Sequence, residues 1–137
     1  MKSSQKHGTR EMPASRYEGY LRKAKEFYQT MYSAEKAENW NAVGLNGVHC
    51  VISLIDTLLV RYAGVRSIED DHMAVIDLLT SSTTSKLNDV REKSQLARRV
   101  IAKKNLVAYE NRSFLKTEAL DMIKRVERFY RWAISQL

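Results

Sequence analysis

Of the three histidines in this 137-residue chain, His49 is the one whose neighbours in the sequence favour chemistry. It recurs at intervals of three and four residues with Asn46, Ser53 and Asp56, which places the four side chains along one line of a helix. Histidine titrates near neutral pH and can therefore act as a general acid or base. The same pattern is typical of buried polar residues that bond to neighbouring helices, so both interpretations stay open.

A lysine interrupts the apolar stripe of a helix predicted over residues 86–109. The stripe consists of Val90, Ala97, Ile101 and Ala108. In a continuous helix Lys104 lies in the middle of this stripe, where it must reach out along its stem, pair with an acid, or face a groove or a subunit interface. Together with Asn105 it can then meet the line of polar residues around His49. Alternatively the helix ends near Lys103 and Lys104 is exposed.

Positive charge is concentrated in residues 91–112, where seven Lys or Arg residues accompany two Glu, a net charge of +5 in a chain of net charge +7. Such a basic segment predicts a nucleic acid or an acidic partner. The candidate binding residues are Arg91, Arg98, Arg99, Lys103, Lys104 and Arg112. The alternative is a solvated helix face.

The sequence predicts no metal and no cofactor. Its single cysteine, Cys50, has apolar neighbours and no Cys/His spacing of a metal site around it, so we expect an inert core residue. The sequence contains no glycine-rich phosphate loop, no nucleophile elbow and no HExxH helix.

The elements that must position these residues are helices. Apolar residues recur at helical rather than strand spacing, and one proline and five glycines leave few breaks. Helices are predicted over about 15–38, 39–64, 68–80, 86–109 and 117–137. The second is the longest apolar run and organises the rest. The sequence therefore predicts an all-α, four- to five-helix up-and-down bundle, with the first two helices antiparallel because their connection is short.

Capping residues define the predicted helix ends. Ser15 with Glu18, Ser67 and Thr117 are candidate N-caps, and Gly64 is the expected end of the central helix. Residues 1–14 lack periodicity and are predicted to form a flexible basic tail.

We expect residues 15–137 to form a single helical-bundle domain. The start of the chain has no apolar h-region, and residues 48–60 are too short to span a bilayer and contain His49 and Asp56. The sequence therefore predicts a cytoplasmic protein with no membrane association.

Two segments carry a resemblance to a known family: the central LNGVHCVISLIDTLLV and, after a basic helix, KNLVAYENRSFLKTEALDMI. Over residues 15–137 the pattern resembles the HEPN superfamily, whose members are compact helical bundles and usually dimers. Many are RNases, often toxins, with a site formed across the dimer. Others are non-catalytic partners of small nucleotidyltransferases, or nucleic-acid-binding modules.

The RNase signature of this family is Arg, a polar residue such as Asn, three further residues and His. In this chain Asn105 is kept, Lys104 stands for the Arg and Tyr109 for the His. Tyrosine, with a pKa near 10, is a poor acid or base at neutral pH, and lysine lacks the bidentate fork of arginine.

The resemblance therefore implies a non-catalytic binding module, expected to be a homodimer. Through its basic fourth helix it would engage RNA or a nucleotide, or a nucleotidyltransferase or antitoxin partner. The alternative is a weak or atypical metal-independent RNase, the toxin of a toxin–antitoxin pair. Its candidate catalytic residues are Lys104, Asn105, Tyr109 and His49.

Overall fold

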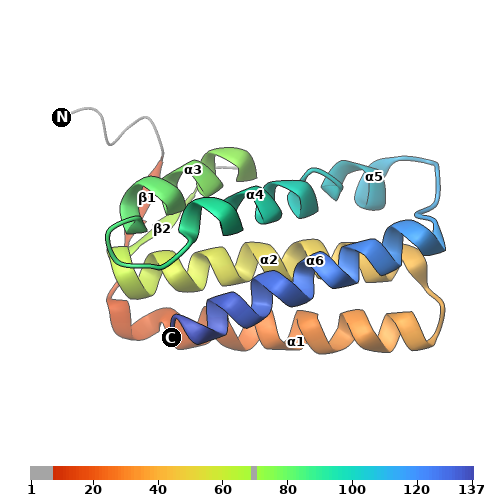
Figure 1. Ribbon diagram of the computed structural model, residues 1–137, viewed down its shortest axis with the longest axis horizontal. Coiled ribbons are helices and arrows are strands. Elements are labelled where there is room, and N and C mark those ends of the chain that lie inside the picture. The colour runs from red at the N-terminus through yellow and green to blue at the C-terminus, as the bar shows by residue number, and fades with distance from the viewer. Residues whose placement is uncertain (1–7, 69–70) are drawn as a thin grey trace.

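The computed structural model describes residues 8–68 and 71–137 and confirms the all-α bundle. Its elements are β1 (Thr9–Glu11), the 3-10 helix η2 (Ala14–Arg16), α1 (Tyr17–Lys36), α2 (Trp40–Ala63), β2 (Val65–Ser67), α3 (His72–Thr83), α4 (Val90–Ile101), α5 (Lys104–Tyr109) and α6 (Lys116–Ser135). In Figure 1, α2 runs between α1 on one side and the α3–α4–α5 layer on the other, and α6 crosses in front of it.

The central helix α2 packs against every other α-helix. Its buried side chains lie on most sides of the helix, as the apolar run of the sequence predicts. Gly64 ends α2 in the left-handed conformation (φ 65°), which confirms the predicted C-cap. Among the described residues, α2 alone has the length and apolar composition of a membrane span, and 72% of that window is buried within the bundle.

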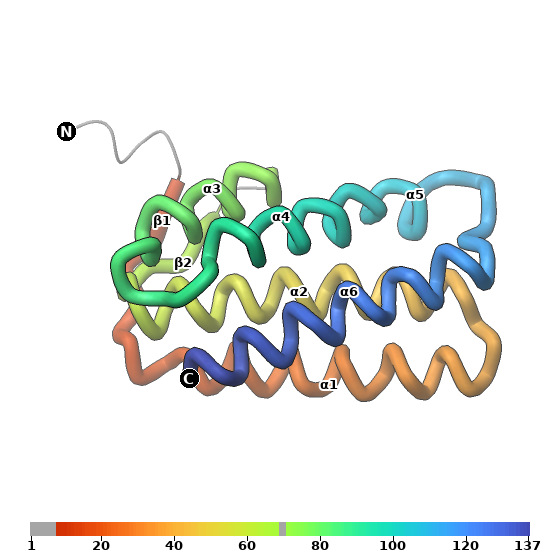
Figure 2. Tube along the Cα trace, viewed as in Figure 1, coloured from red at the N-terminus to blue at the C-terminus, as the bar shows by residue number. Residues whose placement is uncertain are grey.

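Helices α1 and α2 form the predicted antiparallel hairpin, which the chain trace in Figure 2 follows from end to end. The backbone N–H of Asn39 donates to the carbonyl of Ala34 at 2.9 Å and closes the turn between them. Ala24 and Met31 of α1 are buried. Cys50 is also buried in the core, and burial raises the pKa of its thiol to about 12, as expected for an inert residue.

The N-terminal expectation is wrong for residues 9–11. Instead of a flexible tail, they form β1, which pairs antiparallel with β2 in the register Thr9↔Ser67 to Glu11↔Val65. The N–H of Met12 extends the pairing by donating to the carbonyl of Gly64 at 2.8 Å. Backbone hydrogen bonds hold this ribbon together, and no apolar periodicity in the sequence indicates it. Residues 1–7 of the predicted tail lie outside the described residues.

The beginning of α3 differs from the prediction because Ser67 belongs to β2. The N-cap is Asp71, whose carboxylate accepts hydrogen bonds from the N–H groups of Met73 (2.9 Å) and Ala74 (3.4 Å). The helix then continues to Thr83, beyond the expected end at residue 80. Glu69 and Asp70, expected in its first turn, lie outside the described residues.

The long helix predicted over residues 86–109 is two helices. α4 ends at Ile101, Ala102 and Lys103 form a turn, and α5 begins at Lys104. The alternative that the helix ends near Lys103 is therefore closer to the structure.

Two predicted N-caps differ as well. Arg16 precedes α1, so Ser15 does not cap it. α6 follows Leu115 rather than Thr117, and the N–H of Leu115 donates to the Glu118 carboxylate at 2.8 Å.

Substitution of Gly44 tests the close packing of α2 against α5 and the segment that follows it. A Cβ at Gly44 would lie 2.5 Å from Cγ1 of Val107 and 2.9 Å from the buried Phe114 ring. We expect Gly44→Ala to lower the free energy of unfolding by about 1–3 kcal/mol, as overpacking does, in urea unfolding. Gly19→Ala in α1 is the control, because a Cβ at Gly19 would meet nothing within 4 Å. This substitution should stabilise the helix by about 0.5–1 kcal/mol. An unchanged Gly44→Ala protein would contradict this packing.

Candidate functional site

Lys104, the residue that interrupts the apolar stripe, begins a new helix. Because the chain turns at Ala102 and Lys103, Lys104 is half-buried at the start of α5 rather than enclosed in the core. Its ammonium nitrogen lies 5.8 Å from the centre of the Tyr109 ring, which is 75% exposed. Its positive charge also acts on His49 of α2. We call these three residues, Lys104, Tyr109 and His49, the Lys104 cluster.

His49 is held in a partly apolar environment. Its ring packs against Phe27 of α1, with 5.4 Å between ring centres. Burial, and secondarily the charge of Lys104, lowers the pKa of His49 below its usual value near 6.5. The imidazole is therefore neutral at pH 7. The structure thus brings His49 and Lys104 together, whereas the side chain of Asn105 is exposed next to them.

The other polar residues of the predicted line have separate surroundings. Asn46 donates from Nδ2 to the carbonyl of Ala42 in its own helix at 2.8 Å. Ser53 is buried, and its carbonyl accepts a hydrogen bond from Thr57 Oγ1 at 2.7 Å. Asp56 lies seven residues beyond His49 in α2, where the charges of Arg66 and Lys23 act on it. The four polar residues therefore do not form one site, and His49 is the one on which Lys104 of α5 acts.

Asp56 is a half-buried carboxyl group. Burial raises its pKa to about 6, while the positive charges of Arg66 and Lys23 act in the opposite direction. The Arg66 guanidinium stacks over the Tyr20 ring at 5.6 Å, and its Nε is buried without a hydrogen-bond partner among the described residues.

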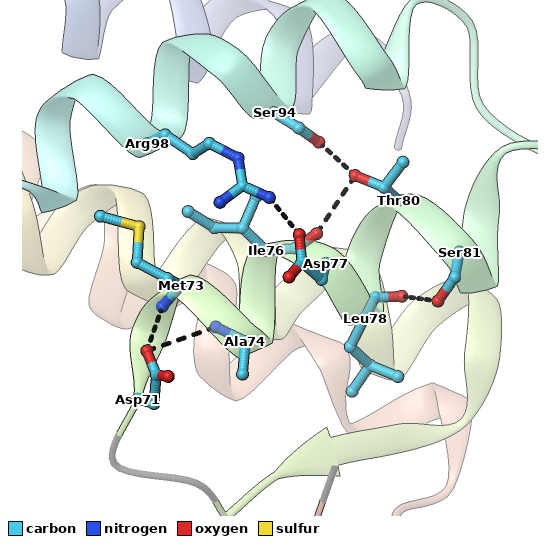
Figure 3. A network of polar contacts seen from close by, with 10 residues as sticks. All are labelled: Asp71, Met73, Ala74, Ile76, Asp77, Leu78, Thr80, Ser81, Ser94 and Arg98. Carbon is cyan, nitrogen blue, oxygen red and sulfur yellow. Dashed lines mark hydrogen bonds and ion pairs between the residues drawn. The ribbon is translucent and has the colours of Figure 1, made fainter. Parts of the chain in front are cut away.

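The candidate binding residue Arg98 lies on the side of α4 that faces α3. Figure 3 shows its guanidinium paired with Asp77, next to a hydrogen bond of 2.7 Å between Thr80 and Ser94. Arg91 lines the same hollow between α3 and α4 and forms no ion pair with a described residue. Arg98 therefore ties α4 to α3, and a part for it in binding stays a prediction.

Arg112 holds the start of α6. Its two guanidinium nitrogens donate to the two carboxylate oxygens of Glu118 at 2.9 and 2.8 Å. This pair, with the N–H of Leu115, lowers the pKa of Glu118 to about 2. Arg112 thus fixes the loop that leads into α6, and its expected binding role also stays a prediction.

Arg99 of α4 and Lys103 of the turn that follows it face α6 rather than α3. Neither forms an ion pair with any residue that the structure describes. They line a hollow of about 250 Å³ whose other walls include Phe114, Met122 and Arg125. A neighbouring hollow of about 220 Å³ is lined by Lys93, Leu96, Arg99 and Arg128, together with Glu92 and Gln95. We call the two hollows together the α4–α6 groove.

The sequence reasoning missed Arg125 and Arg128. They are three residues apart in α6 and so share a face of that helix, but acidic residues alternate with them along the chain. The packing of α6 on α4, which no local sequence pattern indicates, groups them with Arg99.

No three His, Cys, Asp or Glu side chains gather as a metal site would require, within the part of the chain that the structure describes. Comparison of this chain with protein-family models, with curated proteins and with solved structures found no match.

The raised pKa of Asp56 predicts a pH-dependent stability. Between pH about 4 and 6 the folded protein binds a proton that the unfolded chain has lost, so the free energy of unfolding falls as pH rises through this window. We expect Asp56→Asn to be more stable than the wild type by about 1–3 kcal/mol at pH 7, a difference that shrinks towards pH 4.

Urea unfolding of both proteins across this range measures the difference. His49 titrates in both proteins, so the difference isolates Asp56. A pH-independent difference would contradict the burial of this carboxyl group.

Proposed function

We propose that this chain is a non-catalytic, HEPN-like binding module that binds RNA through its basic fourth helix, α4. The observation that carries the proposal is the position of Arg99 and Lys103 and their lack of a carboxylate partner among the described residues. Both line the hollow between α4 and α6, and neither forms an ion pair with a described residue. Arg98 and Arg112, in contrast, are held by carboxylates that belong to the fold.

Cations that form no ion pair with a described residue can contact a polyanion. Phosphates of RNA gain affinity from such contacts mainly by releasing counterions, and arginine adds bidentate hydrogen bonds to phosphate oxygens. The net charge of +7 favours RNA over an ordinary protein surface as the partner.

The absence of catalysis is inferred from the Lys104 cluster. Where the family signature has histidine this chain has Tyr109, and Tyr109 is 75% exposed. The histidine near Lys104 is His49, which is packed against Phe27. An acid or base that titrates near neutrality is therefore missing from the signature position.

The resemblance also implies a homodimer and, in some members, a nucleotidyltransferase or antitoxin partner. We propose the homodimer together with RNA binding. Sedimentation equilibrium of the purified protein is expected to give twice the monomer mass of 15.9 kDa. A monomer at micromolar concentration would contradict the dimer and leave RNA binding to be judged by its own measurement.

RNA binding is expected to weaken steeply with salt. In fluorescence anisotropy with a single-stranded RNA, Arg99→Ala combined with Lys103→Ala should lower the slope of log affinity against log salt by about 1.4, since each phosphate contact contributes about 0.7. Lys25→Ala combined with Lys36→Ala removes the same charge from exposed positions of α1 and should leave the slope unchanged. Equal effects of the two double variants would show that net charge alone is responsible.

A second candidate function is a weak metal-independent RNase, favoured by the position of Lys104 between His49 and Tyr109. Incubation of the wild-type protein with RNA in the presence of a metal chelator tests it. We expect no cleavage. Cleavage that is lost in both Lys104→Ala and Tyr109→Phe proteins would establish the RNase and overturn the non-catalytic assignment.

A further inference from the structure

The α4–α6 groove lies where two antiparallel helices pack along one another. α4 and α6 are in contact and run in opposite directions in Figure 1. The two hollows of the groove share Arg99, so they adjoin along this line of contact. Lys93 of α4 lines one hollow, and Lys103 of the turn that follows α4 lines the other.

Cations from both helices line this groove. They are Lys93 and Arg99 of α4, Lys103 of the turn that follows α4, and Arg125 and Arg128 of α6. The carboxylates that line it are Glu92, Glu118 and Asp121.

Two of these carboxylates are already neutralised. Glu118 is held by Arg112, and Asp121 is held by Arg125 at 2.7 Å. Among the residues lining the groove, Glu92 is thus the one carboxylate without an ion pair to a described residue, and Lys93, Arg99, Lys103 and Arg128 are the cations without one. The groove therefore has a local excess of positive charge that the fold itself does not use.

We propose that the α4–α6 groove binds the sugar–phosphate backbone of single-stranded RNA, with Arg128 of α6 as a phosphate contact opposite Arg99 of α4. This inference rests on the proposed RNA-binding function and names the surface and the form of RNA. Cations spaced along a groove follow successive phosphates of one strand. Guanidinium groups from facing walls hold a phosphate between them in charge-assisted hydrogen bonds.

The size and lining of the groove favour one strand over a duplex. Hollows of about 250 and 220 Å³ between packed helices admit a phosphate and its sugar rather than two paired strands. Of the apolar side chains that line the groove, Leu96 is half-buried, whereas Val100, Phe114 and Met122 are buried in the core. An unpaired base or sugar has an apolar face that Leu96 can contact, whereas the bases of a duplex are stacked inside it.

The experiment compares two arginines of α6. Binding of an oligouridylate of about eight nucleotides is measured by fluorescence anisotropy over a range of salt, for the wild type, Arg128→Ala and Arg131→Ala. Arg131 is exposed about one turn along the same helix but lines neither hollow of the groove, and its charge acts on Tyr28 of α1. Both variants remove one exposed arginine, and circular dichroism checks that each is folded.

We expect Arg128→Ala to bind roughly tenfold more weakly, the usual loss of a charge-assisted hydrogen bond, and to lower the salt slope by about 0.7. Arg131→Ala should bind as the wild type does. A duplex of the same length should compete poorly with the oligouridylate.

Three results would overturn the inference, and they differ in what they leave standing. Salt-dependent wild-type binding that Lys104→Ala weakens, but Arg128→Ala does not, would move the site to the Lys104 cluster and keep RNA binding. Equal competition by the duplex would overturn the assignment of single-stranded RNA. Wild-type protein that binds neither RNA would overturn the groove and the proposed function together.

Discussion

The need to cover α2 determines the arrangement of this bundle. The helix buries thirteen of its 24 residues, and removal of apolar surface from water contributes about 25 cal/mol per Å². α1 packs along one side, α6 along another, and α3, α4 and α5 share a third. Gly44 and Gly47 allow the closest approaches, because Phe114 and Met122 occupy the space that larger side chains would fill.

The same constraint explains why α4 and α5 are separate helices. Val107 of α5 and Phe114 pack against Gly44, which requires the chain to change direction after Ile101. The turn takes Lys104 out of the apolar stripe and places it near His49 and Tyr109. Packing of apolar side chains thus decides where the charge of this lysine lies.

The parts of the fold that follow from local pattern could be predicted from the sequence. The apolar run of α2, its end at Gly64 and the buried positions Ala24 and Met31 are set by helical periodicity and by the left-handed glycine. The break after Ile101 was only an alternative, since Ala102 and Lys103 suit a helix and tertiary contacts interrupt it. The β1–β2 ribbon was also missed, since three-residue strands have too few side chains to show an alternation.

The candidate site was predicted in part. The basic character of residues 91–112 is plain in the sequence, yet Arg98 and Arg99 are neighbours with different surroundings, one paired with Asp77 and the other facing α6. Adjacent helical residues point about 100° apart, so their partners depend on which helices pack on each side. Arg128 was missed because the packing of α6 on α4, which places it with Arg99, is a tertiary contact.

The position of α6 in the chain has a consequence for synthesis. Chains fold as they are made, N-terminal parts first, and the α1–α2 hairpin can form from local contacts as soon as residue 63 is available. Until α6 follows, one apolar side of α2 remains uncovered and α4 lacks the opposite wall of its groove. Nascent chains that stop before α6 would therefore expose an apolar surface to chaperones and proteases. They would also lack one wall of the α4–α6 groove.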